Sequence, residues 1–397
     1  MPGSRSDSLW LVIPAAQRAS GEWLDDTLKE RLNERGLSTK APLAGNFPRQ
    51  RVEVIRANDP WQQANELFYL RGWTDGLPIV PPEINKVEKM VEHVGLARDH
   101  IVAELEPLRG IATVEKIAVQ AVMAGCVPQY ISVLITLTEA IASPEFNLRG
   151  VQTTDENVTP LLIFSGELTK RLDINAGFGA LGPGWRANAT IGRALRLIMH
   201  NLGGGWPGAV SLAGLGQPGR YSLCLAENSA SNPWEPLHVE LGFDGAVSTV
   251  TLMRAETVIT VTGGLEEIAS VMGTAASQFS VMHGGRVAVV LAPYVAQQLA
   301  QNGWSKRDVK EWLYENGRIT TAEWDRWWAR KTLTSHQWPV WVTHAAELGS
   351  IQVVENPDDI LVVVAGGDLH IPQNAYFPTW GFPPCRITRT IREAVIS

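Results

Sequence analysis

The chain has 397 residues, of which 45% are hydrophobic and 19% are charged, and its formal net charge is −7. This apolar content suffices for a large buried core, and the length favours two or three domains. A nucleic-acid-binding surface would need a basic stripe, which this acidic chain does not carry. No window reaches the roughly 18 apolar residues of a membrane helix, and the apolar stretch 9–16 is too short for a secretory signal. We therefore expect a cytoplasmic protein that binds neither nucleic acid nor membrane.

The cysteine usage agrees with that compartment. The chain has three cysteines, Cys126, Cys224 and Cys385. An odd and sparse set in a large chain without an export signal indicates a reducing compartment, so each thiol needs its own explanation.

The first 245 residues predict helices that alternate with short strands. Residues 1–50 are polar and weakly patterned, and we expect them to form an N-terminal arm. Three prolines keep the segment TDGLPIVPP (74–82) out of a helix. Apolar spacing and capping residues, Asn188 among them, give the other elements. Strands are predicted at 52–55 and 161–164, and helices at 60–69, 83–94, 113–122, 127–142 and 189–202.

The rest of the chain has a more β-rich pattern. The aliphatic run 360–365, followed by two glycines, is typical of a central strand that is buried on both faces. Alternating strands and helices predict an α/β fold with a layered, mostly parallel sheet, flanking helices and two lobes. The expected units are the arm, a Cys126-containing lobe at 51–245 and a C-terminal lobe at 246–397. Further strands are predicted at 247–253, 258–262 and 287–291, and helices at 265–277, at 293–302 and after Ser305.

Cys126 is the leading candidate for a reactive group. It stands in the string AVMAGCVPQY, where Gly125 allows the backbone to turn and a helix is predicted to begin at Val127. The positive end of a helix can lower the pKa of a thiol and stabilise developing negative charge. We therefore expect a thiolate at Cys126. The alternative is a small buried residue between two packed helices.

A second candidate site is the polar stretch 217–240. Glu227, His238 and Glu240 lie close together in sequence, and on a strand His238 and Glu240 would share a face. A carboxylate beside an imidazole can orient it as a general base, so we predict His238 and Glu227 as catalytic partners. The same stretch could instead supply metal ligands, although its spacing matches no standard zinc pattern, or it could be a polar surface loop. Predicted substrate contacts from this stretch are Asn228, Trp234 and Glu235, and the alternative metal set is Cys224, Glu227, His238 and Glu240.

Other polar positions are weaker candidates for substrate binding. GFGALG (177–182) fits a dinucleotide motif as a string but is followed by Pro-Gly-Trp and not by a helix. Arg186 and Asn188 stand at the predicted start of a helix, where an anion can bind. Asp75 lies in the proline-rich TDGLPIVPP segment, and Gly366, Gly367 and His370 follow the aliphatic strand, where ligands of α/β sheets bind. His200 is predicted to be structural, because it suits the last turn of its helix.

Four strings together resemble one family. They are ELFYLRGWTDGLPIVPP, ATVEKIAVQAVMAGCVPQY, RANATIGRALRL and GQPGRYSLCLAEN followed by PWEPLHVE. This set resembles a bacterial family of poorly characterised proteins linked to the group named after its UGSC motif, in which selenocysteine or cysteine precedes a helix. The resemblance covers most of 60–245 and implies a reactive sulfur at Cys126. The family's usual Arg and Glu around the proline are replaced here by Val127 and Gln129, which puts a shared substrate in doubt.

These observations predict a cysteine-dependent enzyme of the hydrolase or lyase type, with Cys126 as nucleophile or as acid/base. Its substrate would be a small, polar and partly aromatic molecule, no cofactor is expected, and the expected assembly is a homodimer. The alternatives are a metal-dependent enzyme, a thiol redox protein and a non-catalytic ligand-binding protein. Seven of the fifteen tryptophans fall between Trp304 and Trp341, which indicates an aromatic subdomain or a pocket wall.

Overall fold

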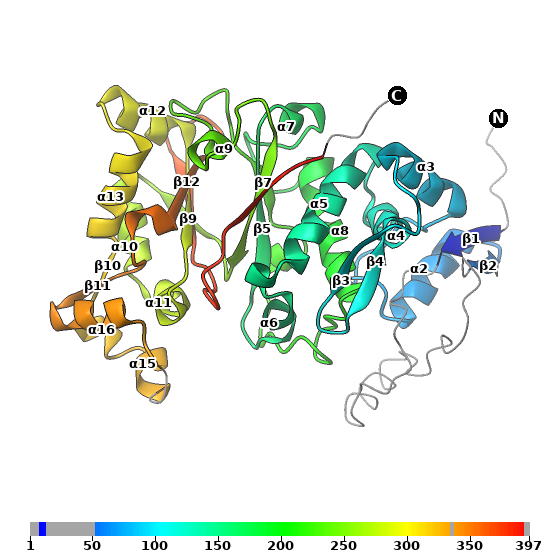
Figure 1. Ribbon diagram of the computed structural model, residues 1–397, viewed down its shortest axis with the longest axis horizontal. Coiled ribbons are helices and arrows are strands. Elements are labelled where there is room, and N and C mark those ends of the chain that lie inside the picture. Colours follow the sequence, from blue (N-terminus) through cyan, green and yellow to red (C-terminus); the bar gives the residue numbers. More distant parts are fainter. Residues whose placement is uncertain (1–7, 13–51, 334–336, 393–397) are drawn as a thin grey trace.

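The computed structural model describes residues 8–12, 52–333 and 337–392. The chain has an α/β fold with helices and mixed sheets (Figure 1). Most of the predicted N-terminal arm lies outside the described residues, but its strand β1 (Ser8–Val12) pairs antiparallel with β2 (Val52–Arg56). No helix in the described ranges is long and apolar enough to cross a membrane.

A group of helices covers one side of the molecule, on the right in Figure 1. Asp59 caps the helix that starts at Pro60, and Thr113 caps the helix that starts at Val114, as their residue types favour. The predicted cap Asn188 is wrong, because that helix begins two residues earlier, with Trp185 at its N-cap. The elements of this part are α2 (Pro60–Leu70), α3 (Ile84–Val94), β3 (Ile101–Leu105), β4 (Gly110–Thr113), α4 (Val114–Ala124), η1 (Pro128–Tyr130), α5 (Ile131–Ala142), η2 (Pro144–Phe146), α6 (Leu148–Thr153), α7 (Leu168–Arg171) and α8 (Arg186–Asn201).

The first sheet has the strand order β14-β7-β5-β6. Its strand β5 is parallel to β6, and both β5 and β14 are antiparallel to β7. All seven residues of β5 and of β7 are buried, because the sheet is covered on both faces. The elements of this part are β5 (Thr159–Ser165), η3 (Pro218–Arg220), β6 (Cys224–Ala226), α9 (Leu237–Glu240), β7 (Thr249–Ala255) and β14 (Ile387–Thr390).

The second sheet has the order β12-β9-β13-β8 and repeats the pattern of the first, with a parallel pair at one edge and two antiparallel neighbours. Ser305 caps α13, as predicted, and it also forms a capping box with Asp308. The elements of this part are β8 (Ile259–Thr262), α10 (Leu265–Met272), η4 (Ala275–Ser277), α11 (Gln278–His283), β9 (Val287–Leu291), α12 (Pro293–Gln301), α13 (Lys306–Asn316), β10 (Arg318–Thr320), α14 (Thr321–Trp324), α15 (Trp328–Thr332), α16 (Val340–Glu347), β11 (Ser350–Gln352), η5 (Pro357–Asp359), β12 (Ile360–Val364) and β13 (Gln373–Phe377).

The two sheets share one core. A buried cluster contains Leu161 and Ile163 of β5 together with Val290 of β9 and Val363 of β12. The other face of the first sheet packs against α4, α5 and α8, and the other face of the second packs against α10 and α13 (Figure 1). Each sheet is therefore buried between helices and its partner sheet.

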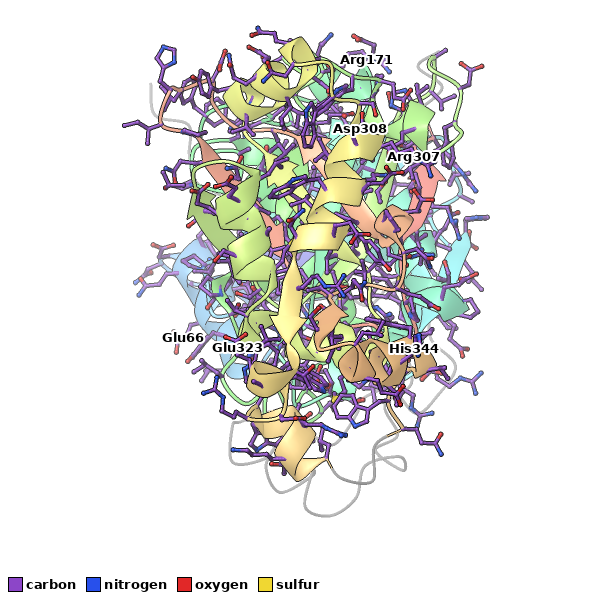
Figure 2. All side chains as sticks on the ribbon, turned by 90° about the vertical axis from the view of Figure 1, so that its left-hand side faces the viewer. Glu66, Arg171, Arg307, Asp308, Glu323 and His344 are labelled. Atoms are coloured by element: carbon purple, nitrogen blue, oxygen red, sulfur yellow. The ribbon has the colours of Figure 1, made fainter. Side chains whose placement is uncertain are left out.

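The tryptophan-rich region belongs mainly to the second core. Trp324 is buried, contacts Trp327 and Trp338 edge to face, and lies among the residues that pack on β9 and β12. A groove of about 550 Å³ next to Trp304 and Trp312 is lined by α13. Seen from that side (Figure 2), Arg307 and Asp308 lie near the start of α13, whereas Glu323 and His344 lie toward the other end of the molecule.

The topology corrects three predictions. The sheets are mixed and not mostly parallel, since two of the nine strand pairings among the described residues are parallel. The boundary at 245 cuts the first sheet, because β7 and β14 follow it in sequence. The strand predicted as central, β12, is at the edge of its sheet, although all five of its residues are buried.

Candidate functional site

A cavity lies between α2, α8 and the loop 205–221. Its volume is about 960 Å³, which is at the upper end of the usual range for small-molecule pockets. We call it the Arg–His cavity, after Arg196, Arg220 and His200. Asp75 is the one carboxylate among its described lining residues. The wall also includes Tyr69, Leu70, Gly72, Thr74, Gly76, Gly205, Trp206, Ser211, Leu215, Gln217 and Tyr221.

Two arginines place positive charge on one wall of this cavity. Arg196 Nε donates to the carbonyl of Arg220 at 2.9 Å, and its Nη2 donates to Thr159 Oγ1 at 3.1 Å. Arg220 Nη2 donates to Ser211 Oγ at 3.0 Å. Among the described residues, no carboxylate forms an ion pair with either arginine. Two guanidinium groups without a counter-ion form a site suited to an anionic ligand.

The surroundings of Arg196 lower the pKa of its guanidinium group but leave it protonated at neutral pH. Burial, and then the nearby charge of Arg220, lower the pKa of Arg196 to about 9. Burial also lowers the pKa of Arg220. Arg196 is therefore still protonated at neutral pH, and a bound anion would relieve the repulsion between the two cations.

His200 lines the same cavity one helical turn beyond Arg196, on the same face of α8. Burial, and then the charge of Arg196, lower its pKa to about 4, against the opposing effect of a hydrogen bond to Gly72. His200 Nε2 lies 2.7 Å from the Gly72 carbonyl, which can only accept, so Nε2 carries the proton. The imidazole is therefore neutral at pH 7, and its Nδ1 is unprotonated and can accept a proton.

Asp75 is the one predicted substrate contact that lines the cavity, but its charge is already paired. Arg193 of α8 holds its carboxylate with two bonds, at 2.8 and 2.9 Å, and also donates to the Pro78 carbonyl. Asp75 thus fixes the TDG turn against α8. Its contribution to the cavity is the position of residues 72–76, whose Gly76 has φ +94°.

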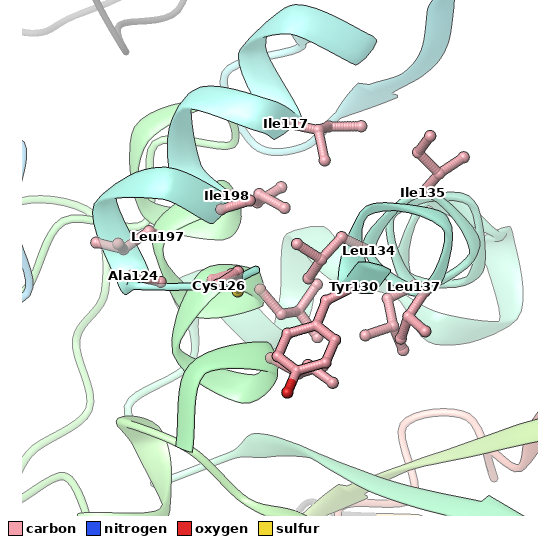
Figure 3. Close-up of a cluster of buried hydrophobic side chains, with 14 of the residues drawn as sticks. Ile117, Ala124, Cys126, Tyr130, Leu134, Ile135, Leu137, Leu197 and Ile198 are labelled. Atoms are coloured by element: carbon pink, nitrogen blue, oxygen red, sulfur yellow. The ribbon is translucent and has the colours of Figure 1, made fainter. Parts of the chain in front are cut away.

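The prediction of a low-pKa thiolate at Cys126 is wrong. Its side chain is 8% exposed and lies among apolar residues of α4, α5 and α8 (Figure 3). Burial raises the pKa of the thiol to about 12, although a bond to Thr190 and the charge of Arg193 act in the opposite sense. The Sγ–H group donates to the Thr190 carbonyl at 3.3 Å. A short 3-10 turn separates Cys126 from α5, so the thiol does not face that helix's first turn directly.

Glu227 and His238 do come together, through a serine that the sequence did not indicate. Ser165 Oγ donates to Glu227 Oε2 at 2.5 Å and lies 2.7 Å from His238 Nδ1. The Ser165 hydroxyl has one proton and donates it to Glu227, so its oxygen accepts the second hydrogen bond from His238 Nδ1–H. All three side chains are at most 3% exposed. Burial raises the pKa of Glu227, while its bonds to Ser165 and the Leu237 amide lower it.

The carboxylate of this network is already occupied by hydrogen bonds within the protein, and none of its three residues lines the Arg–His cavity. Both carboxylate oxygens of Glu227 accept from the Leu237 amide, and Asn232 donates to Oε1. The network therefore joins the ends of β5 and β6 to helix α9. His238 and Glu240 lie on that short helix and not on a strand, so the predicted shared strand face is wrong.

The alternative metal set is not assembled. Among the described residues, no group of three or more His, Cys, Asp or Glu side chains could hold a metal ion. Cys224 is buried in β6, and burial raises the pKa of its thiol. Although burial opposes it, ion pairs with Lys306 and Lys310 hold the pKa of Glu240 below its ordinary value.

The remaining predicted contacts have other surroundings. Asn188 is buried and joins α8 to residues 175 and 180 and to β6. Arg186 is exposed at the start of α8. Trp234 Nε1 donates to the Trp304 carbonyl, and the Glu235 carbonyl accepts from Lys306.

The loops that follow the two parallel strand pairs meet each other. The Asn228 amide donates to Val364, and the Gly366 amide donates to Ala176, both at 2.8 Å. Gly367 packs so closely on the Phe178 ring that a Cβ would lie 2.2 Å from it. His370 is exposed and contacts Tyr294 edge to face.

Sequence reasoning missed most of the Arg–His cavity. Thr159, which Arg196 contacts, is the first residue of β5, so the cavity lies toward the amino end of this strand and not beyond its carboxyl end. One signal was present in the sequence, because Arg196 is a charged residue among the apolar positions of an amphipathic helix. The close approach of Gly205 to Gln152, where a Cβ would collide, is visible only in the structure.

Comparison with known proteins adds no relative. No protein-family model matches the chain, and no curated protein sequence matches it. The resemblance to the UGSC-motif group therefore stays a prediction.

Proposed function

We propose that this chain is an enzyme of the hydrolase or lyase type that acts on a small, anionic and partly aromatic molecule bound in the Arg–His cavity. Arg196 and Arg220 hold the anionic group, and aromatic side chains such as Trp206 contact the rest. His200 Nδ1 accepts a proton from the substrate or from a water molecule. The observation that carries the proposal is a neutral imidazole in one cavity with two guanidinium groups to which the described part of the chain supplies no counter-ion.

The chemistry of the cavity links binding to proton transfer. A histidine with a pKa near 4 is a weak base at neutral pH. The charge of Arg196 is one cause of that low pKa, so an anion that neutralises Arg196 raises the pKa of His200. Substrate binding thereby makes His200 a stronger base at the moment when a proton must be accepted.

Calorimetry and NMR with simple probes test this proposal. Benzoate should bind to the full-length protein, and its neutral isostere benzamide should bind at least tenfold more weakly. Benzoate should also raise the pKa of His200, followed through its ring proton. Arg196→Gln should reduce benzoate affinity tenfold or more. The control Arg307→Gln, at an exposed arginine on α13, should leave the affinity unchanged. Equal binding of benzoate and benzamide would contradict the proposal.

The cysteine-dependent mechanism and the homodimer expected from the sequence remain proposals. Burial and the raised pKa of Cys126 count against this residue as a nucleophile. Its neighbour Arg193 lies on the face of α8 that also lines the cavity, so the thiol is close to the proposed site. Activity that survives Cys126→Ala would remove the thiol from the mechanism. Light scattering at several protein concentrations tests the dimer.

A further inference from the structure

The lining of the Arg–His cavity includes large apolar side chains that are exposed to solvent. Four of its lining residues are large hydrophobic side chains with high exposure: Tyr69 at 62%, Leu70 at 51%, Leu215 at 92% and Tyr221 at 48%. Tyr69 and Leu70 come from the end of α2, and Leu215 and Tyr221 come from the loop 205–221. Exposed apolar groups gathered at one place mark a surface that is covered when a ligand or partner binds.

The charge of the cavity is carried by residues other than these four, which we call the apolar rim. The cations, Arg196 and Arg220, are held by Thr159 and Ser211, which are both buried. Asp75, the one carboxylate of the described lining, is paired with Arg193. The described lining thus combines an anion-binding wall with apolar walls that reach solvent.

The volume is also larger than a single anionic group requires. At about 960 Å³ the cavity matches the space that drug-sized ligands occupy. Resting on the proposed function, we propose that the ligand is an amphiphilic carboxylate. Its head lies against Arg196 and Arg220, and its apolar tail leaves the cavity across the apolar rim.

A homologous series of straight-chain carboxylates, from acetate to dodecanoate, tests this inference by calorimetry on the full-length protein below each probe's micelle concentration. Burying a methylene contributes about 0.8 kcal/mol, which corresponds to roughly fourfold in affinity. Affinity should therefore rise about fourfold per added carbon over at least four carbons. An alkylammonium series of the same lengths should bind at least tenfold more weakly at every length.

Variants of the rim locate the tail. The double substitution Leu70→Ser and Leu215→Ser should flatten the chain-length dependence, so that dodecanoate loses much more affinity than acetate. Leu348→Ser, at an equally exposed leucine next to α16, should leave the dependence unchanged.

The outcomes separate this inference from the proposed function. If short carboxylates and benzoate bind but chain length has no effect, the amphiphile is excluded and the anion site stands. If no carboxylate binds, the proposed function itself fails. Equal affinities of the carboxylate and the alkylammonium of the same length would show that the cavity binds any apolar chain and would overturn the pairing of head and tail.

Discussion

At the scale of single residues, burial decides which ionisable groups can do chemistry. Cys126 packs against α8 and His200 belongs to α8, and burial favours the neutral form of each. For the thiol, neutrality removes its nucleophilic form. For the imidazole, neutrality leaves Nδ1 unprotonated in a residue that lines the cavity. The same physical cause therefore disfavours one candidate and supports the other.

His200 gives a prediction about stability and pH. Its pKa is about 4 in the folded chain and near 6.5 in the unfolded chain, so between these values the unfolded chain binds the extra proton. Its contribution to stability is therefore present above pH 6.5 and is lost as the pH falls toward 4, by up to about 3 kcal/mol. His200→Gln keeps a donor for Gly72 and should reduce the loss of stability between pH 7 and pH 5, measured by urea unfolding. An unchanged pH profile in this variant would contradict the neutral imidazole.

Cys126 gives a kinetic prediction. With a raised pKa and 8% exposure, the thiol should react with iodoacetamide at pH 7 at least tenfold more slowly than glutathione does. Adding urea beyond the unfolding midpoint should remove this protection. A rate in the folded chain above that of glutathione would restore the thiolate predicted from the sequence.

At the scale of elements, local signals in the sequence were reliable. Proline and capping residues gave the starts of α2, α4 and α13, and aliphatic runs gave β9 and β12. The misplaced cap at Asn188 is instructive. An amide suits a cap, but this side chain is buried, where it bonds to Asn175, Ala180 and Cys224, partners that the sequence alone could not place beside it.

Asn188 therefore joins three elements, and removing its amide should be costly. Asn188→Ala would leave the Asn175 amide and several carbonyls without partners in a buried region, which typically costs about 1–3 kcal/mol for each unsatisfied group. We expect a fall of about 2–4 kcal/mol in the free energy of unfolding. Asn316→Ala, at an exposed site of α13, should change it by less than about 0.5 kcal/mol. Similar effects of the two substitutions would show that the Asn188 bonds contribute little.

At the scale of the whole molecule, the sequence predicted the fold class but not the spatial arrangement of the strands and helices. The α/β class follows from alternating elements, whereas the return of β14 to the first sheet depends on pairing across more than a hundred residues. The sequence could not predict the Arg–His cavity for the same reason, because its lining segments meet only after folding. These segments are 69–76, 196–200 and 205–221. The pair Glu227 and His238 was found because both lie in one short polar stretch, while Ser165 between them was not.

The shared core predicts one unfolding transition. Seven of the fifteen tryptophans lie in 304–341, so fluorescence is weighted toward the half that contains the second sheet. Labelling of Cys126 reports on the half that contains the first sheet. Because side chains of both sheets form one cluster, the two probes should give the same urea midpoint. Ile387→Ala, in β14, should lower both midpoints together. Separate midpoints would show that the halves unfold independently.

The position of β14 has a consequence for biosynthesis. Strands β5, β6 and β7 are complete at residue 255, but their sheet lacks an edge strand until residue 387 has been translated. At 5–20 residues per second, the intervening 132 residues (387 − 255) take roughly 7 to 26 seconds. During this interval the nascent chain exposes the edge of β7, which is open to pairing with another chain. The second sheet, whose last strand ends at residue 377, is therefore made before the first can close, so the half of the molecule that is synthesised first is the last to be finished.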